Sequence, residues 1–314
     1  MKIGEKWMTW TLLEAGTRTL SKMTHKVVGS LIATFAYTFF ATAIVGLVQV
    51  AVSYAIVRSK KIKLIDKPAN IIGACLFGFF AVIASIFAFG AFYYGGDIGV
   101  NSFIITLSIV PGALIDKFFF NHKLIGREWF GILIAILAGY AILGWPSLAE
   151  FARLPLWVWM SFGTMLPVAI NQGITQKIKD INPFVKNFWG GLTTILLCMI
   201  ALFIIGEGRI LFEFSAPPMF YIVSTMTGLI AMGIWTFNLM GYKGGASIAI
   251  KKLVMNGTYL ILAMICGIVF FGEQVSFGKG VGVGLYLVAF AFMDQGTWNF
   301  LSSNARNAAR ETNL

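Results

Sequence analysis

The sequence predicts an all-α polytopic membrane protein of ten transmembrane helices, arranged as two inverted repeats of five. Three observations lead to this fold class. Of the 314 residues, 58% are hydrophobic and only 12% are charged, with a mean hydropathy of +0.82, whereas about 25% of the residues in soluble domains are charged. Apolar runs of membrane-spanning length follow one another along the chain. The second half of the chain also partly repeats the first.

Ten candidate spans follow in order, and we place them at residues 7–24, 27–57, 70–94, 101–119, 129–143, 156–174, 188–205, 221–240, 247–271 and 281–300. The first span carries Glu14, Arg18 and Lys22, which step by four and so form one stripe of a helix. An amphipathic helix on the membrane surface is the alternative, and it would leave nine spans. Pro111 and Pro167 interrupt two spans, since proline removes a helical hydrogen bond.

The net charge of +11 reflects membrane topology rather than nucleic-acid binding, because the basic residues lie in short connections between apolar spans. Most of them, including Lys186 in the predicted connection 175–187, fall on alternate connections. The positive-inside rule then places both termini in the cytoplasm of a cell-membrane protein. Because five spans is an odd number, the second repeat enters the membrane from the opposite side.

The repeat divides the chain into residues 1–150 and 151–314. An offset of 145 positions aligns Ser102 with Ser247, Thr106 with Lys251, and Pro111 with Asn256. Inverted repeats place their substrate site near the membrane midplane, between the two halves. We therefore expect the polar residues of the spans to line a shared cavity.

Lys251 and Lys252 lie a few residues inside the ninth span, where a lysine costs roughly 2.5–3.5 kcal/mol on insertion scales. Such charges face a cavity, find a partner, or extend to the headgroups. Neighbours on a helix point about 100° apart, so the two lysines cannot both face one narrow cavity. The repeat favours Lys251 because it aligns with the polar Thr106.

Two stretches carry a family resemblance: FYYGGDIGVNSFIITLSIVPGALIDKFFFNHKL and its echo FNLMGYKGGASIAIKKLVMNGTYLILAMICGIVFFGEQV. They resemble the third-to-fourth and eighth-to-ninth helix regions of the drug/metabolite transporter superfamily, EamA-like branch. The resemblance covers nearly the whole chain. It implies ten helices in two inverted repeats, a central cavity lined by the fourth and ninth helices, and alternating access.

Some residues match this family pattern and others depart from it. Pro111 matches a proline of the fourth helix, and Glu273 matches the small-residue-plus-Glu ending of the ninth. Asn256 stands where the second repeat often has proline, and His122 where the first often has glutamate. The pair Lys251-Lys252 resembles the basic residues of the phosphate-sugar and nucleotide-sugar branches.

The sequence thus predicts a secondary transporter of a small organic metabolite, preferably anionic or zwitterionic. The expected site comprises cations that attract the solute, polar groups that orient it and a proton-carrying carboxylate: Arg18, Lys251, Lys252, Thr106, Asn171, Gln172, Asn256 and Glu14. One alternative is a proton-coupled exporter of cationic drugs that uses Glu14. Another is a non-transporting scaffold or receptor.

Enzyme signatures such as HExxH, GxSxG and CxxC are missing from the sequence. We therefore expect no enzymatic activity, no cofactor and no metal site. The expected partners are a small-molecule solute and the lipid bilayer, with no nucleic acid, and the chain is expected to be a monomer or a homodimer.

Overall fold

The structure is a computed structural model that describes residues 3–119, 125–213, 215–244, 248–274, 276–293 and 298. Within these residues every regular element is an α-helix. Five helices are long and apolar enough to cross a membrane, as expected for a helical membrane protein: α2 (Ala36–Ser59), α3 (Pro68–Tyr93), α9 (Pro183–Ile204), α11 (Pro218–Lys243) and, over its part Val254–Phe271, α12 (Ile248–Phe271).

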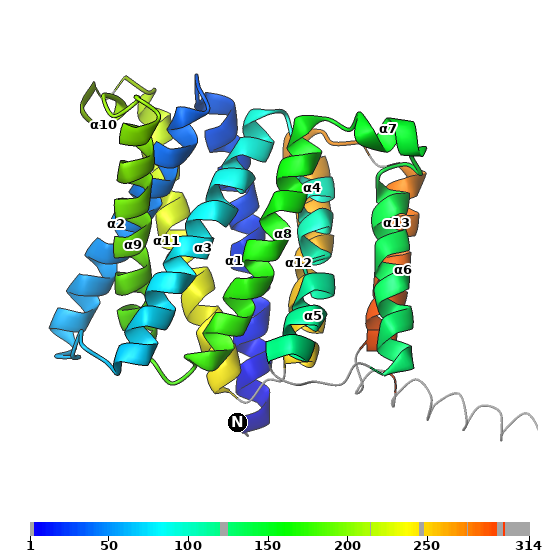
Figure 1. The fold of residues 1–314 in the computed structure, drawn as a ribbon, viewed down its shortest axis with the longest axis horizontal. Coiled ribbons are helices and arrows are strands. Elements are labelled where there is room, and N and C mark those ends of the chain that lie inside the picture. Colours follow the sequence, from blue (N-terminus) through cyan, green and yellow to red (C-terminus); the bar gives the residue numbers. More distant parts are fainter. Residues whose placement is uncertain are drawn as a thin grey trace, which may run out of the picture.

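The other helices of the bundle stand beside these five and run along the same axis (Figure 1). They are α1 (Ile3–Leu31), α4 (Ile98–Thr106), α5 (Ile109–Phe119), α6 (Gly126–Ile142), α8 (Leu156–Lys177) and α13 (Phe277–Met293). The short helices α7 (Leu148–Ala152) and α10 (Ile210–Glu213) lie in connections. We call the end of the bundle at which α1 begins the lower end. α8 begins at the opposite, upper end (Figure 1).

Helix α1 is an inner helix of the bundle. It packs against α11, α12 and α3, and its residues Glu14 and Ala15 are completely buried. A helix lying on the membrane surface would expose the charged stripe instead of enclosing it. The packing of α1 therefore favours an inner helix over a surface helix, and the number of spans stays a prediction.

The predicted interruption at Pro111 is present. Helix α4 ends at Thr106 and α5 begins at Ile109, so the rod breaks over Leu107 and Ser108. Proline cannot donate to the carbonyl four residues earlier and its ring clashes with that group, which here belongs to Leu107. The Leu107 carbonyl accepts from the amide of Val110 instead, at 2.9 Å. Pro167, in contrast, lies inside the continuous helix α8.

Helices α3 and α11, one from each half of the chain, have the same length. Each has 26 residues, and they begin 150 positions apart. The described part of α12 begins directly after residues 245–247, which lie outside the described ranges. The offset of 145 between the two halves therefore stays a prediction.

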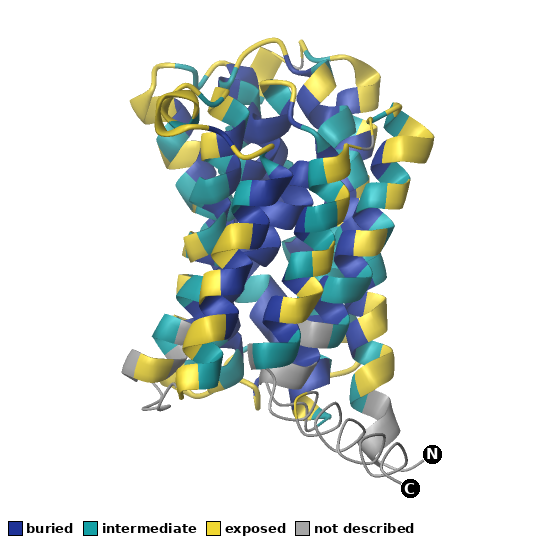
Figure 2. Cartoon of the chain, turned by 90° about the vertical axis from the view of Figure 1, so that its right-hand side faces the viewer, coloured by how far each residue is buried: buried dark blue, intermediate teal, exposed yellow. Residues whose placement is uncertain are grey.

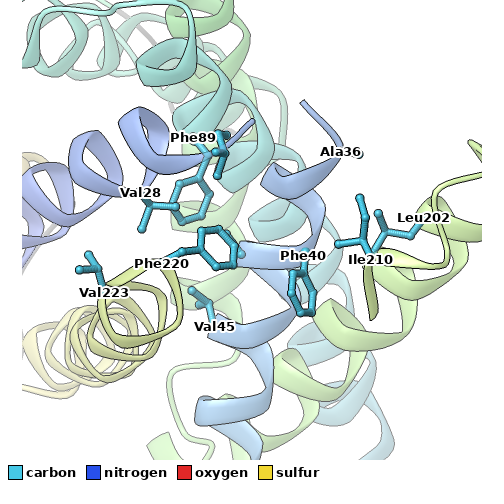
Figure 3. Close-up of a cluster of buried hydrophobic side chains, with 11 residues drawn as sticks. Val28, Ala36, Phe40, Val45, Phe89, Leu202, Ile210, Phe220 and Val223 are labelled. Carbon is cyan, nitrogen blue, oxygen red and sulfur yellow. The ribbon is translucent and has the colours of Figure 1, made fainter. Parts of the chain in front are cut away.

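Buried residues lie on the inward faces of the helices and exposed residues on the outward faces (Figure 2). One apolar cluster occupies the upper part of the bundle, where Phe40 of α2 stacks on Phe220 of α11 at 5.9 Å between ring centroids. Figure 3 shows this cluster, to which Val28 of α1 and Phe89 of α3 also belong. With Leu202 of α9, it joins five long helices from both halves of the chain.

Glycines allow α3 and α9 to approach closely. A Cβ atom on Gly78 would collide with the carbonyl of Gly190 and lie 3.0 Å from its Cα. We expect Gly78→Ala to destabilise the fold by about 1–3 kcal/mol, the usual cost of overpacking. Gly16→Ala is the matched control, because a Cβ there meets no atom within 4 Å and alanine favours the helix. Melting temperatures in detergent measure both, and equal effects would contradict close packing at Gly78.

Candidate functional site

A cavity of about 160 Å³ lies inside the bundle, between helices of both halves of the chain. Helices α1, α2, α3, α4, α8, α11 and α12 contribute to its wall, and so does Ser108 at the break between α4 and α5. Roughly 150 Å³ is enough to hold a molecule of the size of benzene. The space therefore suits a small metabolite.

Five of the seven predicted binding residues line this cavity. They are Arg18, Thr106, Asn171, Gln172 and Asn256. They come from α1, α4, α8 and α12, which the fold brings together from widely separated parts of the chain. The structure therefore brings these five side chains to one cavity, and binding of a solute by them stays a prediction.

Glu14 lies behind the wall, at the centre of an ion-pair network, and is 0% exposed. Its Oε1 accepts from Arg18 Nε at 2.9 Å and Nη2 at 2.7 Å, and from Asn238 Nδ2 at 2.9 Å. Its Oε2 lies 2.8 Å from Lys251 Nζ. The carboxylate is therefore fixed between two cations and does not line the cavity.

Lys251 is 1% exposed and does not line the cavity either. Besides Glu14, its ammonium contacts the carbonyl of Asn238 at 3.0 Å and lies 4.0 Å from the ring centroid of Tyr242. The Tyr242 hydroxyl donates to Gln172 Oε1 at 2.8 Å, so Lys251 is connected to the cavity wall through one side chain. The side chain of Lys252 lies outside the described residues.

Lys22 is a cavity residue that the sequence prediction left out of the site. It lies one turn beyond Arg18 on α1, lines the cavity and donates to Asn101 Oδ1 at 2.9 Å. Asn101 in turn donates to Ser161 Oγ of α8 at 2.7 Å. The signal was available, because Lys22 belongs to the same four-residue stripe as Glu14 and Arg18.

Lys186 shows a second error of the sequence prediction, which placed it in a connecting loop. The structure places it in the first turn of α9, fully buried. Asn182 caps this helix, accepting from the amide of Phe184, and Pro183 occupies its first position. An Asn-Pro pair of this kind is a known helix-start signal, so the sequence did contain the information.

Aromatic rings bound the cavity at two places. His25 lines it and stacks on Phe89 of the upper apolar cluster, at 4.1 Å between ring centroids. Phe77 and Trp235 also line it, and their rings meet edge to face at 4.5 Å. The charged and amide groups of the wall lie among these apolar contacts.

The upper end of the bundle carries a separate group of ion pairs. Glu273 pairs with Lys26 of α1, and its oxygens accept from the first amides of α4, at Ile98 and Gly99. A carboxylate at a helix N-terminus is favourable because of the helix dipole. The carboxylate that matched the family pattern thus joins the ends of α1, α4 and α12.

Asp97 caps α4 from the preceding connection and pairs with Lys279 at 2.7 Å. Burial would raise the pKa of Asp97, but the hydrogen bond from Lys279 and that from the amide of Val100 together hold it below its usual range. The stability that this pair contributes is therefore present at neutral pH. It is lost only as the pH falls through the lowered pKa.

Comparisons with known proteins inform the fold but not the function. No family model matches the chain, and no curated protein does. Twenty-eight chains of solved structures match. One of them, described only as "Crystal structure of protein", has a TM-score of 0.59 and 15% sequence identity, and the match covers 93% of this chain and 96% of that chain. At this identity the likeness concerns the fold alone.

Proposed function

We propose that this protein is a secondary transporter of a small organic anion, which it moves across the cell membrane by alternating access. The charge of the cavity wall carries the proposal. Arg18 and Lys22 line the cavity, and no carboxylate of the described residues does. A solute that brings negative charge would meet both cations without displacing a partner carboxylate from the wall.

The charge balance inside the bundle supports the same conclusion. Among the described residues, Glu14 is completely buried, and the side chain of Glu273, at the upper end, is 7% exposed and paired with Lys26. Three lysines are buried as well: Lys22, Lys186 and Lys251. Buried charges require compensation, because removing them from water costs several kcal/mol per ion. An anion in the cavity would add negative charge in the middle of the bundle, where Glu14 is the buried carboxylate of the described residues.

The alternative of a cationic-drug exporter depends on Glu14 as an exchanging carboxylate. Such a group has to meet the solute, whereas Glu14 stands behind Arg18 and is held by Arg18, Lys251 and Asn238. A positively charged solute would also face Arg18 and Lys22. The scaffold alternative gives no role to a polar cavity shared by both halves, whereas a receptor would bind a ligand there without moving it across the membrane.

For the fold we propose ten membrane-spanning segments in two inverted repeats, with α4 and α5 forming one segment. The packing partners favour this arrangement. α1 packs on α11 and α3 on α8, a pair of contacts that a two-fold axis would exchange. α2 packs on α9, α4 on α12 and α6 on α13, contacts that the same axis would map onto themselves.

The proposed topology places both termini and the lower end in the cytoplasm. Two exposed positions test this: Ser59, the last residue of α2, and Ser215, on the α10–α11 connection. In a variant with Cys75, Cys198 and Cys266 replaced by alanine, we expect a cysteine at 215 to react with an impermeant reagent added outside. A cysteine at 59 should react only after the membrane is opened. The reverse pattern would contradict the proposed orientation.

The test of function is a ligand screen followed by a flux measurement. A ligand that binds only the folded state raises the melting temperature, so the purified protein is screened with succinate, glutamate, glycerol 3-phosphate and cationic dyes. We expect the anions to stabilise it and to enter proteoliposomes. Stabilisation and uptake of the cations alone would overturn the anion assignment, and flux of neither class would overturn the transporter.

A further inference from the structure

Lys186 is a buried lysine that neither the cavity wall nor the Glu14 network uses. Its side chain is 0% exposed, its Nζ donates to Thr175 Oγ1 of α8 at 2.9 Å, and it lies 3.7 Å from the centroid of the Phe77 ring of α3. In the described part of the chain, no carboxylate lies within ion-pairing distance of it. Its immediate partners are thus a hydroxyl and a phenyl ring.

More distant charged groups do not neutralise a positive charge on Lys186. Glu14 attracts an ammonium at this position, but Lys251 and Arg18 repel it, and Glu14 is already shared between those two cations. The helices α3 and α8 present Phe77 and Thr175 to it, which carry no charge. A permanent positive charge here would remain without a counter-ion in an apolar surrounding, which is costly.

The position of Lys186 links it to the cavity. Phe77, whose ring the ammonium contacts, also lines the cavity. Thr175 lies one helical turn from Asn171 and Gln172, which line it as well. An anion in the cavity would therefore lie across one aromatic ring from Lys186, and its negative charge would favour the ammonium form in this low-dielectric region.

We propose that Lys186 carries the proton of a proton–anion symport cycle. Its neutral amine binds a proton from the aqueous phase when an anion enters the cavity, and the ammonium releases it when the anion leaves. The step adds a positive charge where the solute adds negative charge, and it consumes nothing else. This inference rests on the proposed anion transport, and it moves the coupling role from Glu14, where the sequence placed it, to Lys186.

The test compares Lys186→Met with Lys177→Met, which alters an exposed lysine at the end of α8. Proteoliposomes that contain a pH-sensitive dye receive succinate, glutamate or glycerol 3-phosphate. In the wild type and in Lys177→Met, we expect anion uptake to carry protons inward and the apparent Kd to fall about tenfold for each pH unit of acidification. In Lys186→Met, we expect loss of the proton signal and of this pH dependence.

Two further variants make the result decisive. Lys186→Arg keeps a positive charge that does not deprotonate, so it should bind the anion with a Kd independent of pH. His25 is a titratable group that lines the cavity itself, and His25→Gln should keep the proton signal. Size-exclusion chromatography and the melting temperature verify folding, and methionine is expected to be tolerated because it removes only the amine from an apolar contact.

The possible outcomes separate the two claims. Wild-type protein that takes up none of the anions contradicts the proposed function and this inference together. Wild-type protein that transports an anion while Lys186→Met still carries protons overturns the inference alone. A proton signal that is lost in His25→Gln and kept in Lys186→Met assigns the coupling to His25 and likewise overturns it.

Discussion

Replacing Glu14 by glutamine is expected to destabilise the protein by about 3–5 kcal/mol, the usual cost of removing one partner of a buried ion pair. Glutamine keeps the shape of the side chain and can still accept a hydrogen bond from Asn238. It leaves Arg18 and Lys251 without a negative charge between them, however. The expected observation is a strongly lowered melting temperature in detergent.

A second substitution tests whether pairing causes this loss. In Glu14→Gln/Lys251→Met, the unpaired ammonium is removed as well, so we expect the melting temperature to recover most of the difference. Glu207→Gln is the control, because Glu207 and Arg209 form an exposed pair, and such pairs contribute about 0–1 kcal/mol. If the double variant were no more stable than Glu14→Gln, the loss of stability would not come from leaving the Lys251 ammonium unpaired.

The sequence predicted those parts of the fold that depend on local signals. Composition alone indicates a helical membrane protein, and the five long apolar helices agree with it. The break before Pro111 follows from the missing amide of proline. The start of α9 also had a local signal, at Asn182 and Pro183, which was not used, and Lys186 was therefore placed in a loop instead of in the interior.

The site was only partly predictable because its contacts join distant parts of the chain. The four-residue spacing of Glu14 and Arg18 indicates their pairing, and the structure has it. Nothing local indicates that Lys251, which lies in the other half, completes the same network. The offset of 145 aligned Lys251 with Thr106 and made it a cavity residue. The structure instead places Lys251 outside the cavity wall, against Glu14.

The contacts of Lys22 and Lys251 distinguish these two lysines. In the first half, a lysine on α1, Lys22, contacts an amide on α4, Asn101. In the second half, the lysine is on α12, Lys251, and the amide is on α8, Gln172, with Tyr242 between them. Lys22 has no carboxylate partner among the described residues and lines the cavity. Of these two lysines, Lys22 therefore has the more direct access to a solute.

We accordingly expect Lys22→Gln to weaken anion binding by about tenfold or more, since hydrogen bonds to charged groups contribute about 1.5–3 kcal/mol. The fold should persist, because glutamine can still donate to Asn101 Oδ1, and removing Lys22 leaves no carboxylate unpaired. The measurement is the Kd for succinate or glycerol 3-phosphate at equal protein concentration, with a substitution of an exposed lysine, Lys179→Gln, as the control.

Lys251→Gln should act differently, lowering the melting temperature through loss of its pair with Glu14. If Lys22→Gln binds anions as tightly as the wild type while Lys251→Gln abolishes binding at an unchanged melting temperature, the anion contacts Lys251 and the cavity wall has to open toward the Glu14 network during transport.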